Sequence, residues 1–107
     1  MLRFTGVVLM SLSLGALAAG EPEFKISIEG HKFSPDKIEV PAGTKVKLLV
    51  ENKDPTPAEF ESTALKIEKV IPGKAKATIF VGPLKAGEYK FVGEYNEKTA
   101  KGVVVAK

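Results

Sequence analysis

The sequence predicts an all-β domain, a Greek-key β-sandwich, and two observations carry the prediction. Hydrophobic and polar residues alternate with a period of two along most of the chain after residue 20, which is typical of strands with one buried and one wet face. Short segments rich in Pro, Gly and Asp interrupt this alternation at frequent intervals. Seven or so short strands separated by such turns favour two packed sheets.

The alternation places the predicted strands, in chain order, at residues 24–28, 38–40, 46–50, 75–81, 89–92 and 103–105. Turns are predicted between them at residues 34–36, 41–43, 54–57, 72–73 and 85–87. Residues 62–65 form the one stretch that could make a helical turn. Tyr89 follows Gly87 by two residues at a strand start, so we expect a tyrosine corner, in which the hydroxyl bonds to upstream backbone.

The first twenty residues are predicted to be a secretory signal peptide. Arg3 supplies a positive start, residues 6–19 form an apolar run, and small residues at 16, 18 and 20 fit a cleavage site. The run is short for a membrane span, although an uncleaved anchor is the alternative. Cleavage would leave one domain, residues 21–107, in the periplasm and not embedded in the membrane.

The charge pattern argues against a nucleic-acid partner. The chain has 16 Lys and Arg and 13 Asp and Glu, a net charge of +3. These charges are interleaved, with no basic block and no basic-aromatic alternation, so a nucleic-acid surface is not expected. The lysines fit a role in keeping strand edges soluble.

A blue-copper centre is excluded by composition. Such a centre needs His, a Cys thiolate and usually an axial Met. The chain has no Cys, and its two methionines, Met1 and Met10, both lie in the predicted signal peptide.

The remaining candidate metal ligands are one imidazole and several carboxylates. Glu59 and Glu61 flank Phe60, so an extended chain would put both carboxylates on one face and Phe60 in the core. The other candidates are Glu68, Glu94 and His31. Oxygen donors with one imidazole suit iron, manganese or copper(II). The alternative is that these glutamates are solvated partners of the many lysines.

Several motifs resemble a known family. Phe33-Ser34-Pro35, Ile38-x-Val40-Pro41-Ala42-Gly43 and Val50-x-Asn52 resemble the opening of bacterial cupredoxin-like domains. A second set of motifs is similar to the EfeO-type (FtrB-type) cupredoxin-like proteins found with bacterial ferrous-iron uptake systems: Pro57-Ala58-Glu59-Phe60-Glu61-Ser62, Glu68-Lys69, Gly82-Pro83-Leu84, Gly87-x-Tyr89-x-Phe91 and Gly93-Glu94-Tyr95.

The resemblance also shows what replaces the copper ligands of blue-copper relatives. Glu59 lies in the region of the first His ligand, Gly93 takes the Cys position and Asn96 the position of the second His. The axial Met region is 100–102, which has no Met. Relatives in the iron-linked family often have His where this chain has Asn96.

The resemblance implies a periplasmic accessory protein of ferrous-iron uptake. Its ligand would be a divalent metal ion, iron or copper, and its partner a membrane iron permease or another periplasmic uptake protein. A ferroxidase role would need an electron acceptor that the chain does not visibly contain, so an enzyme is not the expectation. The alternative is a cupredoxin-like interaction module that binds no metal.

Overall fold

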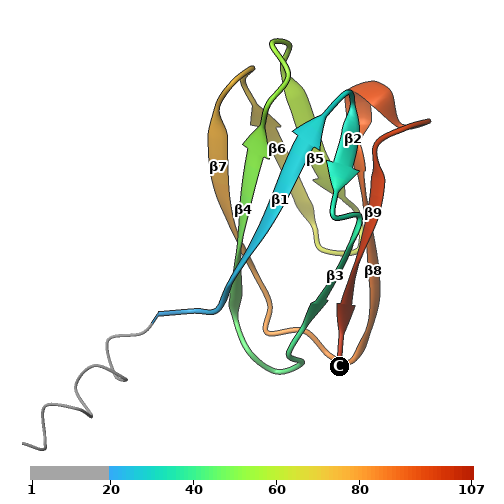
Figure 1. The fold of residues 1–107 in the computed structure, drawn as a ribbon. Coiled ribbons are helices and arrows are strands. Elements are labelled where there is room, and N and C mark those ends of the chain that lie inside the picture. The colour runs from blue at the N-terminus through green and yellow to red at the C-terminus, as the bar shows by residue number, and fades with distance from the viewer. Residues whose placement is uncertain (1–19) are drawn as a thin grey trace, which may run out of the picture.

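The computed structural model describes residues 20–107, and apart from Gly20 the predicted signal peptide lies outside this range. Over the described residues, nine strands form two sheets that pack face to face (Figure 1). The strands are β1 Glu23–Glu29, β2 Lys32–Ser34, β3 Lys37–Val40, β4 Val46–Asn52, β5 Ala58–Ser62, β6 Ile67–Ile71, β7 Lys76–Val81, β8 Gly87–Gly93 and β9 Lys101–Ala106. One short 3-10 helix, η2, spans Glu94–Asn96.

The sheet orders confirm the predicted sandwich. One sheet has the order β2-β1-β4-β7 and the other β3-β9-β8-β5-β6. The β1–β4 and β3–β9 pairs are parallel and the other pairs are antiparallel. No helix among the described residues is long and apolar enough to cross a membrane.

The predicted strands correspond to β1, β3, β4, β7, β8 and β9. The structure has three further strands, β2, β5 and β6. The extended segment around Phe60 is β5, and β2 and β6 lie in stretches for which no strand was predicted. Residues 63–66 between β5 and β6 form a turn, with Lys66 N–H donating to the Thr63 carbonyl at 3.2 Å. This turn takes the place of the helical turn expected at residues 62–65.

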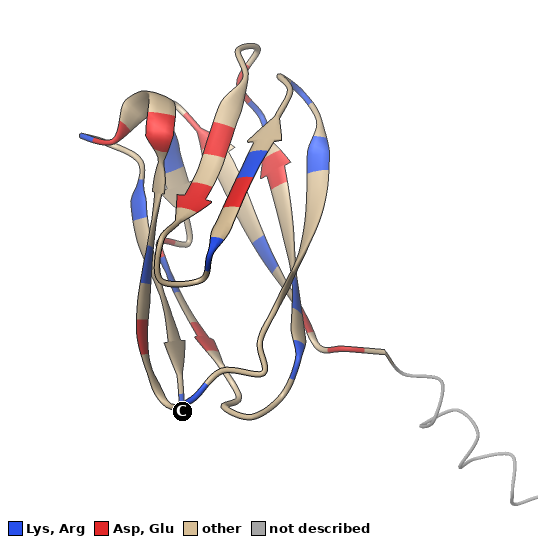
Figure 2. Ribbon diagram, turned by 180° about the vertical axis from the view of Figure 1, so that it is seen from behind, with Lys and Arg blue, Asp and Glu red and all other residues tan. Residues whose placement is uncertain are grey.

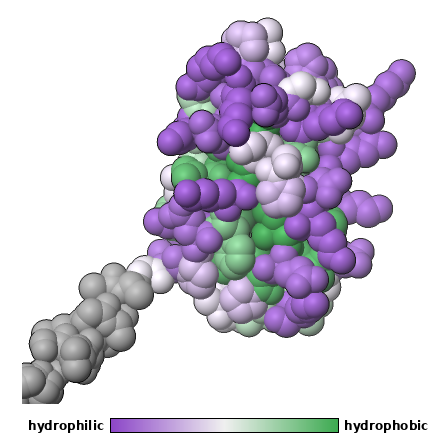
Figure 3. All heavy atoms as spheres, viewed as in Figure 1, coloured by the Kyte–Doolittle hydropathy of each residue, from purple (hydrophilic) through white to green (hydrophobic). Residues whose placement is uncertain are grey.

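Three phenylalanine rings hold the two sheets together. The ring of Phe33 meets those of Phe60 and Phe91 edge-on, with centroids 5.9 and 4.9 Å away, and the rings of Phe60 and Phe91 stack at 4.7 Å. All three side chains are buried. Hydrophilic side chains cover most of the face in view in Figure 3, and a narrow apolar strip shows between them.

The predicted tyrosine corner is confirmed. Tyr89 Oη donates a hydrogen bond to the Lys85 carbonyl at 2.7 Å. The bond ties the start of β8 to the loop that leads into it, and so fixes where β8 begins.

Candidate metal centre

Strand register brings the acidic residues of three elements to one face. Phe60 points into the core, so its neighbours Glu59 and Glu61 point outward from the five-stranded sheet. Glu68 on β6 pairs directly with Glu61, and Gly93 on β8 pairs with Phe60. Glu94, one residue beyond Gly93, therefore reaches the same outer face as Glu59.

Glu59, Glu68 and Glu94 form a compact group of carboxylates. One carboxylate oxygen of each lies within 4.8 Å of the corresponding oxygens of the other two. Figure 2 shows the acidic bands of β5, β6 and the η2 turn gathered at the end of the sandwich away from the C-terminus. The structure thus brings three of the five predicted ligands together, and their binding of a metal stays a prediction.

Glu59 is the buried member of the group. Its residue is only 6% exposed, whereas Glu68 and Glu94 are exposed. A hydrogen bond shared with Glu94, then burial, then the proximity of Glu68, raise the pKa of Glu59 from 4.5 to about 7. The Glu59 carboxyl therefore keeps its proton to a higher pH than an isolated glutamate does.

Glu61 lies beside this group without belonging to it. Partial burial raises the pKa of Glu61, and the charges of Glu94, Glu68 and Glu97 raise it further. Glu97 follows the η2 turn and was not predicted as a site residue. It could have been found only by counting acids near the end of β8.

His31 is placed in a different setting. Its backbone N–H and that of Gly30 donate to the Asp54 carboxylate at 3.0 and 2.8 Å, and these bonds lower the pKa of Asp54. The His31 carbonyl accepts a bond from Thr99 Oγ1 at 2.7 Å, and its side chain is exposed. His31 is not among the side chains that form the three-carboxylate group.

The three carboxylates are spaced suitably for one metal ion. Oxygen ligands lie about 2.0 to 2.6 Å from a divalent ion, so two on opposite sides of it are about 4 to 5 Å apart. The mutual distances of up to 4.8 Å fall within this range. A hard or borderline divalent cation would also offset the repulsion among the carboxylates, which contributes to the raised pKa of Glu59.

The position of a blue-copper thiolate cannot hold copper in this chain. The resemblance assigns that position to Gly93, and a Cβ atom there would lie 2.7 Å from the Ala100 Cβ and 3.6 Å from the Phe33 ring. The space that a ligand side chain would need is thus filled by hydrophobic packing. A thiolate copper site does not fit this chain, whereas the carboxylate group on the outer face fits a cation.

The fold and the acidic group define a β-sandwich protein that carries a cluster of three carboxylates on its outer face. It has no cysteine for an internal thiolate site. The chain belongs to the cupredoxin-like domain family, whose model matches residues 2–106.

The chain is similar to one curated protein in sequence and to copper proteins in fold. An uncharacterized protein of Rickettsia prowazekii (strain Madrid E) is 41% identical over 83 residues, which span 78% of this chain and 66% of that protein. The metal-binding domain of the Cu(I)-exporting P-type ATPase CopA of Streptococcus pneumoniae superposes with a TM-score of 0.71 at 18% identity, covering 79% of this chain and 84% of that chain.

Auracyanin A, a blue copper protein of Chloroflexus aurantiacus, is also similar. It gives a TM-score of 0.66 at 15% identity, covering 82% of this chain and all of that chain. Identities this low show the fold alone. Since this chain has no Cys, it shares the auracyanin fold but is not itself a blue-copper protein.

Proposed function

We propose that this cupredoxin-like protein is an exported metal-binding protein that holds iron or copper(II) through Glu59, Glu68 and Glu94. The observation that carries the proposal is the buried carboxyl of Glu59, which faces two other carboxylates and forms no ion pair with a lysine or arginine within residues 20–107. Burying an acid against other acids is costly unless it keeps its proton or a cation is bound there, and a metal ion would replace that proton.

The proposed setting is ferrous-iron uptake in the periplasm. It rests on the resemblance of the segment around Glu59 and of Gly93-Glu94-Tyr95 to the EfeO-type proteins. In this setting the protein would bind the ion at an exposed site and pass it to a membrane permease or another uptake protein. A site of three carboxylates with two of them exposed suits transfer, because the ion is reached directly from solvent.

A thermal-shift series tests the proposal. The protein produced without residues 1–20 is melted with Fe(II) under anaerobic conditions, with Mn(II) and with Cu(II), each over a range of concentrations. Binding to the folded state should raise the melting temperature in proportion to the logarithm of the metal concentration. Glu59→Gln should remove most of this rise.

A matched substitution provides the control. Glu29→Gln changes an exposed acid on β1, in the other sheet, and should leave the metal-induced rise unchanged. If no metal raises the melting temperature, or if Glu59→Gln responds as the unaltered protein does, the carboxylate site is wrong.

A metal-free interaction module is the second candidate function. Val70, which pairs with Glu59, is 49% exposed, and Tyr95, which follows Glu94, is 54% exposed. Large hydrophobic side chains at the rim of a polar cluster are typical of contact surfaces. This reading would lead if the thermal-shift series showed no metal response.

A further inference from the structure

The strand β7 is a free edge of the four-stranded sheet. The sheet order ends at β7, and β4 is its one hydrogen-bonded neighbour among the described strands. Figure 1 shows β7 at the rim of the sandwich, with no strand beyond it on that side. An edge of this kind presents a row of unpaired N–H and C=O groups to any extended chain that reaches it.

The register of the β4–β7 pair determines which backbone groups of β7 are free. Asn52 N–H donates to the Ala75 carbonyl at 2.8 Å, so these two residues form a hydrogen-bonded pair. In an antiparallel ladder such pairs alternate with non-hydrogen-bonded ones, so every second residue after Ala75 also directs its backbone groups to β4. The residues between them, whose backbone groups point away from β4, are Lys76, Thr78 and Phe80. Within residues 20–107 these groups have no hydrogen-bond partner.

The side chains of the same three residues lie on the outer face of the sheet, because they are exposed while Ile79 and Val81 are buried. The residue Phe80 is 52% exposed, with Lys45 Nζ 5.0 Å from the centroid of its ring. Lys76 is the only charged residue of β7. Natural edge strands are usually protected by being short or by carrying several charges or a proline, and β7 has little of this protection.

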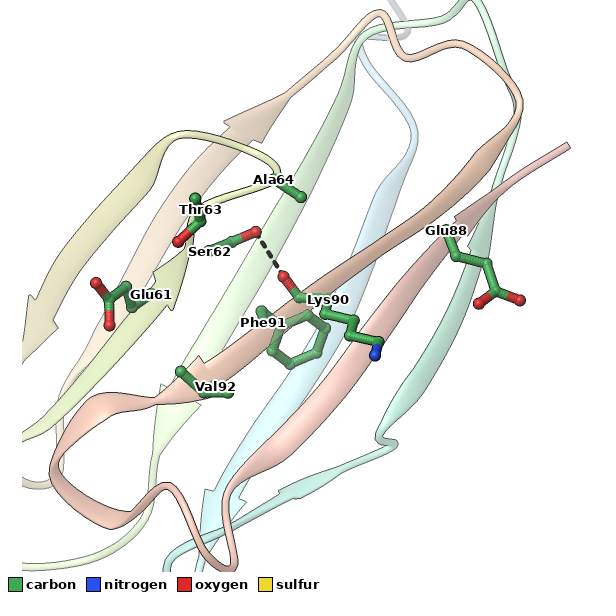
Figure 4. Close-up of a pocket in the computed structure, with 8 residues that line it drawn as sticks. All are labelled: Glu61, Ser62, Thr63, Ala64, Glu88, Lys90, Phe91 and Val92. Atoms are coloured by element: carbon green, nitrogen blue, oxygen red, sulfur yellow. Dashed lines mark hydrogen bonds between the residues drawn. The ribbon is translucent and has the colours of Figure 1, made fainter.

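The other unpaired edges of the sandwich are shorter or better protected. The strands β2 and β3 have three and four residues, and β6 has a Glu and a Lys among its five. The strand β8 has no β5 partner on the N-terminal side of Val92. There, however, Ser62 Oγ donates to the Lys90 carbonyl at 2.6 Å, and the turn residues Thr63 and Ala64 flank the gap (Figure 4). The free edge best suited to pairing is therefore β7.

We propose that β7 pairs with β7 of a second copy of the chain, antiparallel and about a two-fold axis at Thr78. In this register Thr78 lies opposite its own counterpart, and Lys76 lies opposite Phe80 of the second copy. Each of these pairs can exchange both N–H···O bonds, because the backbone groups of all three residues point to the partner. The contact is isologous, so one edge is used twice and both four-stranded sheets join into one.

The side chains favour this register over its neighbours. Thr–Thr pairs are favourable across antiparallel strands, and a lysine opposite an aromatic ring adds a cation–π contact. A shift by two residues would separate Lys76 from Phe80 and shorten the ladder. A shift by one residue would turn the buried face of one strand toward solvent. The strand β7 is thus complementary to itself, which is why we assign a second copy to this edge.

Amide hydrogen exchange tests the pairing residue by residue. The protein produced without residues 1–20 is followed by NMR from low to high concentration with a chelator present, and sedimentation measures its oligomeric state over the same range. As the dimer forms, the amides of Lys76, Thr78 and Phe80 should exchange more slowly. Those of Ala77 and Ile79, which already bond to β4, should change little. A monomer throughout, or unchanged exchange at the three free amides, would overturn the proposal.

Thr78→Pro removes the N–H at the centre of the contact. A proline is compatible with an edge strand where its nitrogen faces away from the sheet, as it does at Thr78 in the monomer. The dissociation constant of the dimer should rise at least about tenfold, because each copy loses a hydrogen bond. Thr78→Ala keeps the N–H and is the matched control, with a much smaller change expected. Equal dissociation constants for the two variants would contradict pairing through the backbone.

A pair of substitutions tests the register. Phe80→Lys places like charges opposite each other at Lys76 and should raise the dissociation constant about tenfold, since two favourable pairs are lost at once. Adding Lys76→Phe to Phe80→Lys exchanges the members of each pair and should restore the dimer. A double variant that dimerises no better than Phe80→Lys would overturn the two-fold register. This result and the exchange measurement still decide the matter if Thr78→Pro fails to fold.

The edge contact and the metal site can be tested independently. The strand β7 belongs to the four-stranded sheet, whereas the three carboxylates are carried by β5, β6 and η2. None of the dimer measurements requires metal. A failure of the dimer therefore leaves the thermal-shift result standing, and the reverse also holds.

Discussion

At the scale of single residues, Glu59 links the chemistry of the site to the stability of the fold. The hydrogen bond between its carboxyl and that of Glu94, together with its burial, raises the pKa of Glu59 to about 7. A proton held this tightly must leave before a metal ion can bind all three carboxylates. The same residue should therefore make both the affinity for the proposed metal ion and the stability of the metal-free protein depend on pH.

The first prediction concerns the metal-free protein. Between pH 4.5 and about 7 the unfolded chain has lost the proton of Glu59 while the folded chain still holds it. Folding stability should therefore fall as pH rises through this window and level off above it. Urea unfolding at several pH values in the presence of a chelator measures the slope.

Glu59→Gln is the matching variant for this measurement. Because Gln does not titrate, the slope should become shallower, leaving the part due to the raised pKa of Glu61. The lowered pKa of Asp54 stabilises the fold above pH 3.8 and does not contribute in this window. Equal slopes in the two proteins would contradict the account of Glu59.

Gly93 carries the second prediction at this scale. Its backbone is extended, with φ −92°, so any residue could adopt its conformation, and only the Ala100 methyl prevents a side chain there. Gly93→Ala should cost about 1 to 3 kcal/mol by overpacking. Adding Ala100→Gly should recover part of the loss, and urea unfolding of the three variants checks both statements. Unchanged stability of Gly93→Ala would show that the site has room for a ligand side chain.

At the scale of elements, the β5–β6 hairpin determines which acids meet. The period of two predicts that Glu59 and Glu61 face away from Phe60, and the structure confirms this. It cannot predict that Glu68 joins them, because that depends on the hairpin register. The turn at residues 63–66 has no Gly, Pro or Asn to mark it, and Lys66 itself adopts a positive φ of 58°.

Local sequence patterns predict β8 but not the burial of Glu59 beside it. The turn motifs and alternation predict β8 and its tyrosine corner, since these features are local in sequence. The burial of Glu59 depends on neighbours from β6 and η2, which only tertiary pairing brings to it. The candidate residues could thus be predicted from the sequence, whereas the separation of His31 from the carboxylate group could not.

The third prediction concerns the aromatic contact that positions β5. Phe60 is fully buried against Phe33 and Phe91, so Phe60→Ala should destabilise the fold by about 3 to 5 kcal/mol. Phe80→Ala is the control, because Phe80 is 52% exposed and should lose less than about 1 kcal/mol. Chemical denaturation of both variants measures the difference. A loss below about 1 kcal/mol for Phe60→Ala would mean that β5 is not fixed by this contact.

At the scale of the whole molecule, the chain has a net charge of +3 but gathers four acids at one place. The proposed metal ion would neutralise this local excess of negative charge. Protons and the metal ion compete for the same carboxylates, so each should weaken the binding of the other. Linkage makes this coupling reciprocal.

The last prediction follows from that competition. The affinity for Mn(II) should fall as the pH is lowered from about 7 to 4.5, because Glu59 then holds its proton. Titration with Mn(II) at several pH values, on the protein produced without residues 1–20, measures the change. In Glu59→Gln the remaining affinity should depend less on pH in this window, since Gln does not titrate. An affinity of the unaltered protein that stays constant from pH 7 to 4.5 would contradict the competition.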